Sequence, residues 1–330
     1  MFKAIRAKLR AKDWETARKK DLYYCYRLLL GRKPDIEGWN TFMADIARGG
    51  ITIQRLVRYF LSSPEFKNNQ RNDEISKKMP VEVELEGFSM YVAPPDGAIG
   101  KYIIDNHIWE PHVTKTLYQL IKPGMVFVDI GANIGYFSML AAKMVGSSGK
   151  VIAFEPDQFN SSLLYLNAQK NSFANIEIYP FAVAESKKIV VYDNLDGNGT
   201  ISNPGDDMTT LISRTVVHAV KLDDLLREEN AVDIIKIDIE GSEHLALLGA
   251  TALIKRHRPV IVTEFTPGGL QNISGVSAEK FLQHITDLNY TLSAINTKGE
   301  RRECGTSTAR VLSFFKSQKQ GHIEILAEPR

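Results

Sequence analysis

The sequence of 330 residues contains only two cysteines, Cys25 and Cys304, and no Cys-x-x-Cys pair. This scarcity excludes a disulfide framework and a cysteine-based zinc site, and it favours a reducing compartment. No apolar stretch reaches the length of a membrane span, and the first residues lack the apolar core of a signal peptide. We therefore expect the chain to stay in the cytoplasm.

The composition, with 44% hydrophobic and 24% charged residues, is typical of an ordinary folded protein. The net charge is +2, but the first 20 residues hold eight Lys or Arg and two acids, or +6, which leaves −4 for the remainder. This balance gives no support to nucleic-acid binding by the main domain. Phe2, Ile5 and Leu9 lie on one side of a possible basic helix. Weak membrane-surface contact by residues 1–12 is therefore an alternative to a plain solvated helix.

A change of pattern divides the chain into a helical domain at residues 1–67, a polar linker at 68–80 and a larger domain at 81–330. In the first domain Gly49-Gly50 ends the second helix and Thr52 caps the third. The phrases Leu-Leu-Gly-Arg-Lys-Pro-Asp, ending at Asp35, and Phe-Leu-Ser-Ser-Pro-Glu-Phe, ending at Phe66, resemble a short helical domain of unassigned role. That domain recurs beside glycan-related enzymes.

Beyond the linker, strand-like and helix-like segments alternate. Residues 81–86 and 88–92 predict a hairpin, and Pro111 begins a helix. The segments that follow are strand 125–130, helix 135–145, strand 150–155, helix 158–170, strands 175–180 and 232–238, helix 243–255 and strand 259–264. This order predicts an α/β fold, a mostly parallel sheet with helices on both faces. We expect the last strands at 290–294 and 310–315.

The segment Asp193 to Asp207 is rich in Gly, Asn and Asp. It is expected to be either a loop that closes over the substrate or a plain surface insertion.

A run of Asp-x-Gly-x-Asn-x-Gly, with Asp129, Gly131, Asn133 and Gly135, follows a buried strand and begins a helix. Glycines there leave the backbone open to a ligand. Glu155 ends the next strand, where an acidic side chain binds both hydroxyls of a ribose. The G-x-G-x-x-G run of nicotinamide and flavin sites is missing, and a carboxylate would repel a diphosphate but attract a sulfonium. These features predict a site for S-adenosylmethionine.

Acidic residues end several strands of the predicted sheet. Because the carboxyl ends of parallel strands meet at one edge, we expect Asp129, Glu155, Asp238 and Glu264 to converge there. Lys236 lies on a buried strand, so an internal ion pair with Asp238 or Asp129 is expected to stabilise the site.

The candidate catalytic residues are Asp238, Glu240 and His244. Either carboxylate is a possible general base, and His244 follows Glu240 by four residues.

The loop, Glu155 and the run Lys-Ile-Asp-Ile-Glu-Gly-Ser-Glu at 236–243 resemble motifs of the class I methyltransferases. They look like the FkbM family over about residues 80 to 295. The resemblance implies a Rossmann-like, seven-stranded, mostly parallel sheet with an antiparallel last strand, and S-adenosylmethionine as the cofactor. The cofactor contacts that it implies are Glu110, Asp129, Gly131, Asn133, Gly135, Glu155, Asp157, Ala182 and Asp238.

The same resemblance implies O-methylation of a sugar hydroxyl in glycan or secondary-metabolite biosynthesis. The alternatives are a non-catalytic nucleoside-binding protein and an NAD-dependent oxidoreductase. A nucleic-acid methyltransferase is disfavoured because Asn203-Pro204-Gly205 lacks the second proline and the aromatic residue of the base-flipping motif. The partner is expected to be a small-molecule or glycan acceptor, and a homo-oligomer is possible.

Metal-free catalysis is expected, with no metal ligands. Asp238, Glu240, Glu243 and Glu264 supply oxygen atoms that suit Mg²⁺. However, the Asp-Asn pair that catechol-type methyltransferases also need is missing. Loss of activity on chelation, with recovery on addition of Mg²⁺, would reverse this expectation.

Overall fold

The computed structural model describes residues 16–66, 80–93, 98–195, 198–202 and 215–330. The chain forms two compact units, Met1–Pro80 and Val81–Arg330, and each is described by itself. The basic segment 1–12 and almost all of the expected linker lie outside the described residues. Among the described helices, none combines the length and the apolar character that crossing a membrane requires.

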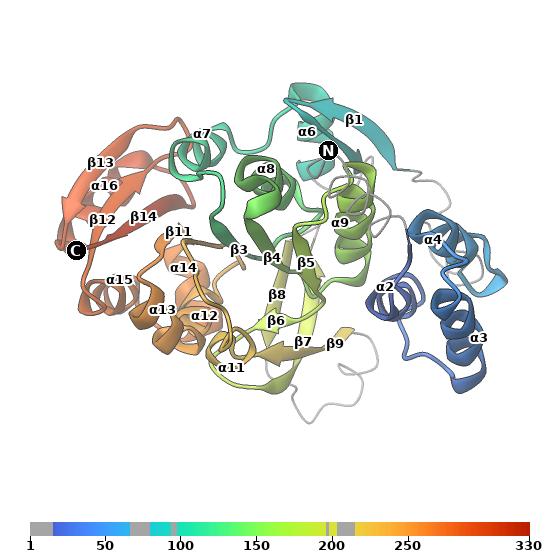
Figure 1. Ribbon diagram of the computed structural model, residues 1–330. Helices are drawn as coiled ribbons and strands as arrows, with labels where there is room; N and C mark the ends of the chain where they lie inside the picture. Colours follow the sequence, from blue (N-terminus) through green and yellow to red (C-terminus); the bar gives the residue numbers. More distant parts are fainter. Residues whose placement is uncertain (1–15, 67–79, 94–97, 196–197, 203–214) are drawn as a thin grey trace. The chain divides into compact units, whose positions relative to one another are not determined.

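The first unit consists of short helices around a small core. They are α2 (Lys19–Tyr24), the π-helical turn η1 (Cys25–Leu29), α3 (Ile36–Ala47) and α4 (Ile53–Ser62), drawn in blue in Figure 1. Asp35 caps α3 by accepting from the Gly38 N–H at 2.7 Å, and Thr52 caps α4 as predicted. In the core, the rings of Tyr26 and Phe60 meet edge to face at 4.9 Å.

Arg32 connects the two sequence motifs of this unit, the one that ends at Asp35 and the one that ends at Phe66. Its guanidinium donates to Glu65 Oε2 at 2.8 Å and to Asp35 Oδ2 at 3.0 Å. Arg32 also lies over the Tyr26 ring, with its Cζ atom 5.1 Å from the centroid. The arginine of the first motif therefore binds the glutamate of the second. This ion pair gives these residues of the two motifs a structural role.

The second unit is built on an eight-stranded sheet. Its strands are β3 (Val126–Ile130), β4 (Lys150–Phe154), β5 (Ile176–Tyr179), β10 (Ile234–Ile237), β11 (Val260–Phe265), β12 (Tyr290–Ile295), β13 (Arg301–Gly305) and β14 (Ile323–Pro329). The order is β13-β12-β14-β11-β10-β3-β4-β5, and β14 is antiparallel to both neighbours. The predicted α/β class, with a mostly parallel sheet and an antiparallel last strand, is confirmed.

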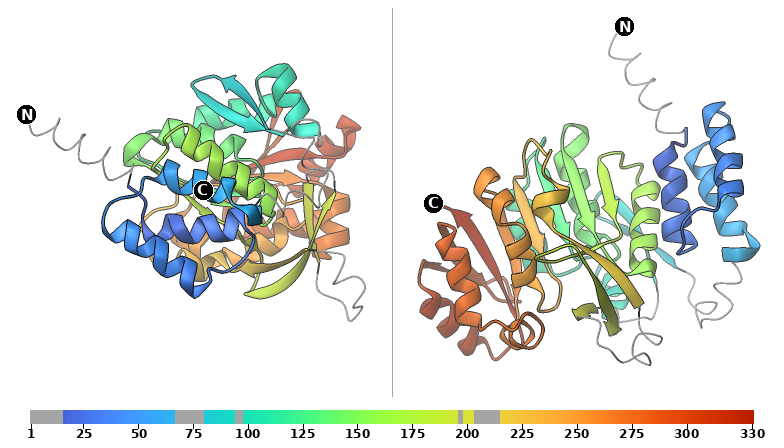
Figure 2. Two further views of the ribbon diagram at one scale, coloured as in Figure 1. Left: turned by 90° about the vertical axis from the view of Figure 1, so that its right-hand side faces the viewer. Right: turned by 90° about the horizontal axis from the view of Figure 1, so that it is seen from below.

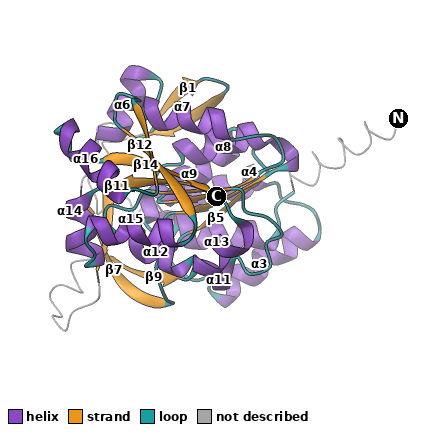
Figure 3. Ribbon diagram, turned by 90° about the vertical axis from the view of Figure 1, so that its left-hand side faces the viewer, coloured by secondary structure: helices purple, strands orange, loops and turns teal. Residues whose placement is uncertain are grey.

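Helices cover both faces of this sheet (Figures 1, 2 and 3). One face carries α7 (Pro111–Leu120), α8 (Tyr136–Val145) and α9 (Gln158–Lys170). The other carries α11 (Leu222–Leu225), α12 (Glu243–Gly249), α13 (Thr251–His257) and α15 (Ala278–Asp287). The shorter pieces are α6 (Ala98–Asn106), η3 (Gly146–Ser148), α14 (Pro267–Gly269) and η4 (Leu270–Ser274). The single helix expected at 243–255 is two helices, because Ala250, at φ −113°, leaves the helical conformation.

The predicted hairpin is confirmed as β1 (Val81–Leu85) and β2 (Phe88–Val92), which pair antiparallel. Two side chains, one from α9 and one from the residue that caps its C-terminus, hydrogen-bond to the backbone of β2. Asn167 Oδ1 accepts from the Tyr91 N–H at 2.6 Å, and Asn171 Oδ1 accepts from the Ser89 N–H at 2.8 Å. The hairpin is thereby fixed to the helical layer.

The last strand predicted from the sequence is wrong. Residues 310–315 lie in α16 (Thr308–Gln318), where Val311 and Phe314 are buried one helical turn apart. Ser307 caps this helix by accepting from the Arg310 N–H at 3.4 Å. The antiparallel strand is β14 instead, and β13 adds an eighth strand at the edge of the expected seven.

A second sheet, which the sequence did not predict, contains β6 (Ala182–Val183), β9 (Thr215–Val220), β7 (Lys188–Leu195) and β8 (Asn198–Ser202), in that order. Its core includes Val190, Tyr192 and Ala219. Part of the loop expected at 193–207 is therefore the hairpin of β7 and β8. Residues 196–197 and 203–207 of that segment lie outside the described residues.

Candidate active site

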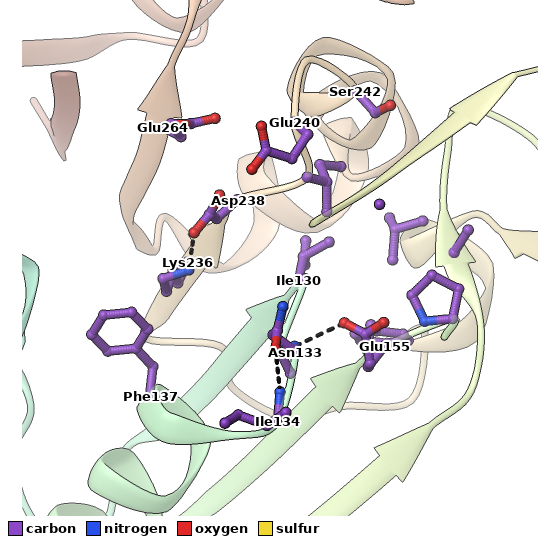
Figure 4. Close-up of a pocket in the computed structure, with 18 of the residues that line it drawn as sticks. Ile130, Asn133, Ile134, Phe137, Glu155, Lys236, Asp238, Glu240, Ser242 and Glu264 are labelled. Atoms are coloured by element: carbon purple, nitrogen blue, oxygen red, sulfur yellow. Dashed lines mark hydrogen bonds and ion pairs between the residues drawn. The ribbon is translucent and has the colours of Figure 1, made fainter. Parts of the chain in front are cut away.

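A cavity of about 320 Å³ opens at the carboxyl ends of β3, β4, β10 and β11. Figure 4 shows the side chains that surround it. The predicted site residues that line it are Glu110, Gly131, Asn133, Glu155, Ala182, Asp238 and Glu240. Trp109, Phe181, Val183, Tyr192, Lys236, Ser242, Glu264 and His322 are among its other lining residues.

The glycine loop lines the cavity with backbone. Gly131 has φ +81°, and a Cβ atom there would lie 1.9 Å from the Asp238 carbonyl oxygen. Only glycine fits this position, because any side chain would collide with the backbone that follows β10. Asn133 is also left-handed, at φ +50°, and its Oδ1 accepts from the Ile134 N–H at 2.7 Å.

Glu155 lies directly after β4 and is only 3% exposed. Its Oε2 accepts from the Asn133 N–H and its Oε1 from the Asp157 N–H, both at 2.8 Å. Burial, followed by the charge of Asp157, raises the pKa of Glu155 to about 8, against the opposing effect of the two backbone donors. Each oxygen keeps lone-pair capacity for one more donor, as two ribose hydroxyls would require.

Three predicted cofactor residues do not line the cavity. Asp129 is completely buried, and its Oδ2 accepts from the Ser138 hydroxyl at 2.6 Å. Gly135 begins α8 at φ +92°, and Asp157 caps α9 by accepting from two backbone N–H groups. These three residues support the loops around the cavity and do not belong to its described lining.

Lys236 is the lysine of the cavity lining, and it is 3% exposed. Its Nζ donates to Asp238 Oδ2 at 2.9 Å and lies 4.7 Å from the centroid of the Phe137 ring. Burial acts against the charge, but Asp238, Asp129 and Glu110 outweigh it and raise the lysine pKa. The predicted internal ion pair is therefore with Asp238, and Asp129 faces Lys236 across β3 and β10.

Asp238, Glu240 and Glu264 lie on the other side of the cavity from Glu155 (Figure 4). Oxygen atoms of Asp238, Glu240 and Glu264 lie within 4.8 Å of one another. Glu110 contributes a buried Oε2 that has no hydrogen-bond partner among the described residues. Burial, and then the charge of Asp238, raise the pKa of Glu110 to about 7.

The structure places His244, a predicted catalytic residue, away from the described lining of the cavity. Its ring packs against Phe281 and His284, with centroids 6.2 and 5.1 Å away. Burial lowers its pKa, so it is held as a neutral ring. His244 lies in the first turn of α12, and both of these ring contacts come from α15.

Sequence reasoning missed His322, Tyr192 and Trp109 as lining residues. His322 directly precedes β14, whose first residue pairs with Phe265 at the end of β11. An antiparallel strand starts at the edge where its parallel neighbours end, so correct placement of β14 would have revealed this histidine. Tyr192 was missed together with the second sheet.

The sequence matches the models of two known protein families. Residues 129–322 match the sequence model of the methyltransferase FkbM domain, and residues 14–70 match a domain of unknown function (DUF4214). The first match covers more than half of the chain and contains the carboxyl ends of β3, β4, β10 and β11, which line the cavity.

Curated relatives match over shorter stretches. Ribosomal RNA large subunit methyltransferase E of Acinetobacter baumannii (strain AYE) is 61% identical over 36 residues, 11% of this chain and 17% of that protein. The protein of the same name from Wigglesworthia glossinidia brevipalpis is 34% identical over 82 residues, 25% of this chain and 40% of its own length. The chain thus spans less than half of either relative.

Solved structures are similar at low identity. The methyltransferase FkbM from Methylobacillus flagellatus KT has a TM-score of 0.38 and 16% identity, over 64% of this chain and 50% of that chain. A SAM-dependent O-methyltransferase from Thermotoga maritima has a TM-score of 0.40 and 12% identity, over 76% of this chain and 86% of that chain.

Proposed function

The chain belongs to the methyltransferase FkbM family, whose methyl donor is S-adenosylmethionine, and we propose that it methylates a hydroxyl group of an uncharged sugar. When bound, the donor supplies an electrophilic methyl carbon. The protein must then hold an acceptor oxygen in line with that carbon and allow the hydroxyl proton to leave.

The donor half of the cavity fits an adenosyl group with a charged tail. Glu155 has acceptor capacity for the ribose hydroxyls, and Phe181, Ala182 and Val183 offer an apolar wall for the adenine. The unpartnered Oε2 of Glu110 suits the methionine ammonium group, because a buried carboxylate without a donor is costly. We propose these residues as the cofactor contacts, together with the loop that contains Gly131 and Asn133.

The acidic side of the cavity, where we place the acceptor, is the reason for proposing an uncharged sugar. Asp238, Glu240 and Glu264 line it, and Lys236 is already paired with Asp238. Carboxylates repel phosphates and carboxylates on a substrate but accept hydrogen bonds from hydroxyl groups. We propose that Asp238 and Glu240 contact the acceptor hydroxyls. The glycan context, the cytoplasmic location and a homo-oligomer stay predictions.

Ribosomal RNA is a second candidate acceptor, because the curated relatives are named as ribosomal RNA methyltransferases. A ribose hydroxyl of RNA would bring its phosphates next to the three carboxylates. Recognition of RNA normally depends on basic groups at the phosphates. The charge of the cavity therefore favours the sugar over RNA.

Labelled S-adenosylmethionine, supplied with three acceptor classes, tests the proposal. The acceptors are neutral oligosaccharides, the same oligosaccharides bearing phosphate, and large-subunit ribosomal RNA. We expect label in the neutral sugars, and a large loss of rate with Glu240→Gln at unchanged affinity for S-adenosylhomocysteine. Label only in RNA would assign the second function. Binding of the donor without transfer to any acceptor would indicate a non-catalytic binding protein.

A further inference from the structure

The cavity has more acidic groups than its described basic groups can pair with. Five carboxyl groups of the described residues line it, those of Glu110, Glu155, Asp238, Glu240 and Glu264, and the basic lining residues are Lys236 and His322. Lys236 forms an ion pair with Asp238, with 2.9 Å between its Nζ and the Oδ2 of the aspartate. The bound donor brings its own positive groups to Glu110. Among the described residues, Glu240 has no ion pair and Glu264 has only His322, 4.0 Å away.

Three of these acids converge on one point. Asp238 and Glu240 follow β10, and Glu264 lies on β11, the next strand of the sheet. One oxygen from each lies within 4.8 Å of the other two, and Figure 4 shows the three side chains on the same side of the cavity. This spacing is compatible with oxygen ligands around one cation, whose bonds measure about 2.0 to 2.6 Å.

Glu264 gives an independent sign of a ligand-binding site. It is only 8% exposed and lines the cavity, yet its buried Oε2 has no hydrogen-bond partner among the described residues. The nearest basic group given for it is His322, whose Nδ1 is 4.0 Å from Oε1. Burial and the charges of neighbouring acids, Asp238 first, raise its pKa well above the usual value. A buried carboxyl with a free oxygen is normally paired or bound to a metal.

We propose that Asp238, Glu240 and Glu264 bind a divalent cation, Mg²⁺ or Mn²⁺, at the acceptor side of the cavity. Ligands that are all carboxylate oxygens select hard cations over zinc or copper. Three protein ligands leave open positions for water and for two oxygens of the acceptor, so the sugar presents two adjacent hydroxyl groups. This acceptor class depends on the proposed function, whereas the cation site does not.

The inference revises the metal-free expectation drawn from the sequence. The Asp-Asn pair of the catechol-type enzymes is missing, but Glu264 occupies the end of the neighbouring strand and supplies a ligand there. Glu243, a fourth candidate ligand in the sequence, is engaged elsewhere, since its Oε1 accepts from the backbone N–H groups of Ile239 and Gly241 at 3.0 Å.

The test is titration of Mn²⁺ into the full chain saturated with S-adenosylhomocysteine, followed by calorimetry and by electron paramagnetic resonance. The demethylated product carries no sulfonium charge, so the carboxylates remain free to bind the metal. We expect Glu264→Gln and Glu240→Gln to weaken Mn²⁺ binding by about 100-fold, since even outer-sphere changes cost about 10- to 100-fold. Mg²⁺ should compete with Mn²⁺ for the wild-type site.

Glu324→Gln is the matched control. Glu324 pairs with Glu264 in the register of β14 and β11 and is also buried, at 6% exposed, but it is not one of the converging acids. It should weaken Mn²⁺ binding by no more than about tenfold, the low end of outer-sphere effects, because it supplies no ligand atom.

Absence of Mn²⁺ binding to the wild type, or equal binding by wild type and Glu264→Gln, would overturn the proposal. Unchanged affinity of Glu264→Gln for S-adenosylhomocysteine shows that the variant is folded. If it does not fold, the less buried Glu240→Gln decides the question. Metal binding without methylation of any sugar would refute the proposed function and leave the cation site standing. Methylation of a sugar diol at full rate in a chelator would do the reverse.

Discussion

At the level of single residues, the acids around the cavity have separate tasks that their sequence positions alone do not distinguish. Asp129 lies on β3, and Glu155 directly follows the neighbouring parallel strand β4. Glu155 lines the cavity, whereas Asp129 is completely buried and does not belong to the described lining. The sequence predicted that acids would gather at this edge because strand ends can be counted. It could not predict which of them point into the cavity, because that depends on loop torsions such as the positive φ of Asn133.

Glu155→Gln should weaken binding of S-adenosylhomocysteine by about 10- to 100-fold, because a hydrogen bond to a charged group contributes about 1.5 to 3 kcal/mol. Calorimetry at pH 8.5 measures the change. Glu177→Gln on the adjacent strand β5 is the control, since Glu177 does not line the cavity. Equal affinities of Glu155→Gln and wild type would show that the ribose lies elsewhere.

The affinity for S-adenosylhomocysteine should rise as the pH increases toward 8. The pKa of Glu155 is raised to about 8, so the group is largely protonated below that value, and only the deprotonated form accepts from two hydroxyls with both oxygens. Glu110, with its pKa raised to about 7, adds a second rise at lower pH as it becomes able to bind the ammonium group. In Glu155→Gln the upper rise should vanish and the lower one remain. A flat profile in the wild type would refute the assignment.

At the level of elements, the glycine loop is the part of the site that tolerates least change. Gly131→Ala would place a Cβ 1.9 Å from the Asp238 carbonyl, so β3 and β10 must separate. We expect a loss of stability above the ~1 to 2 kcal/mol of left-handed strain alone, together with loss of donor binding. Gly275→Ala is the matched control, because Gly275 is left-handed at φ +65° and ψ +21° but has nothing within 4 Å of the added atom. Urea denaturation separates the two, and similar losses would contradict the steric argument.

Helices and strands whose apolar residues recur at a clear period were predictable from the sequence, and those with a weak apolar pattern were not. The buried strands and the helices between them follow from runs of apolar residues. The segment Arg310 to Phe315 has the composition of a strand, but Val311 and Phe314 lie one helical turn apart, and tertiary packing makes it α16. The error at this one element also concealed β14 and with it His322.

At the level of the whole molecule, the α/β class and the antiparallel last strand were predictable because alternating strands and helices permit few topologies. The second sheet was not, since its strands pair across sequence that is rich in turn-forming residues. The proposed boundary near residue 80 remains a proposal about independent folding.

Residues 81–330 alone should bind S-adenosylhomocysteine within about twofold of the full chain, because a compact unit with its own core folds by itself. All the described lining residues of the cavity, Ile99 to His322, belong to this unit. Calorimetry on the shortened protein measures the affinity. A shortened protein that is folded by circular dichroism but does not bind would show that the first unit takes part in donor binding.

The position of Trp109 gives the protein an optical probe of its own occupancy. The chain has three tryptophans, and Trp109 lines the cavity next to Glu110, whereas Trp39 lies in the other unit. Purine bases stack on aromatic side chains, and a purine close to an indole alters the indole's emission. Intrinsic tryptophan fluorescence should therefore report donor binding without any label. Replacement of Trp39 by phenylalanine would lower the background and leave the signal of the cavity.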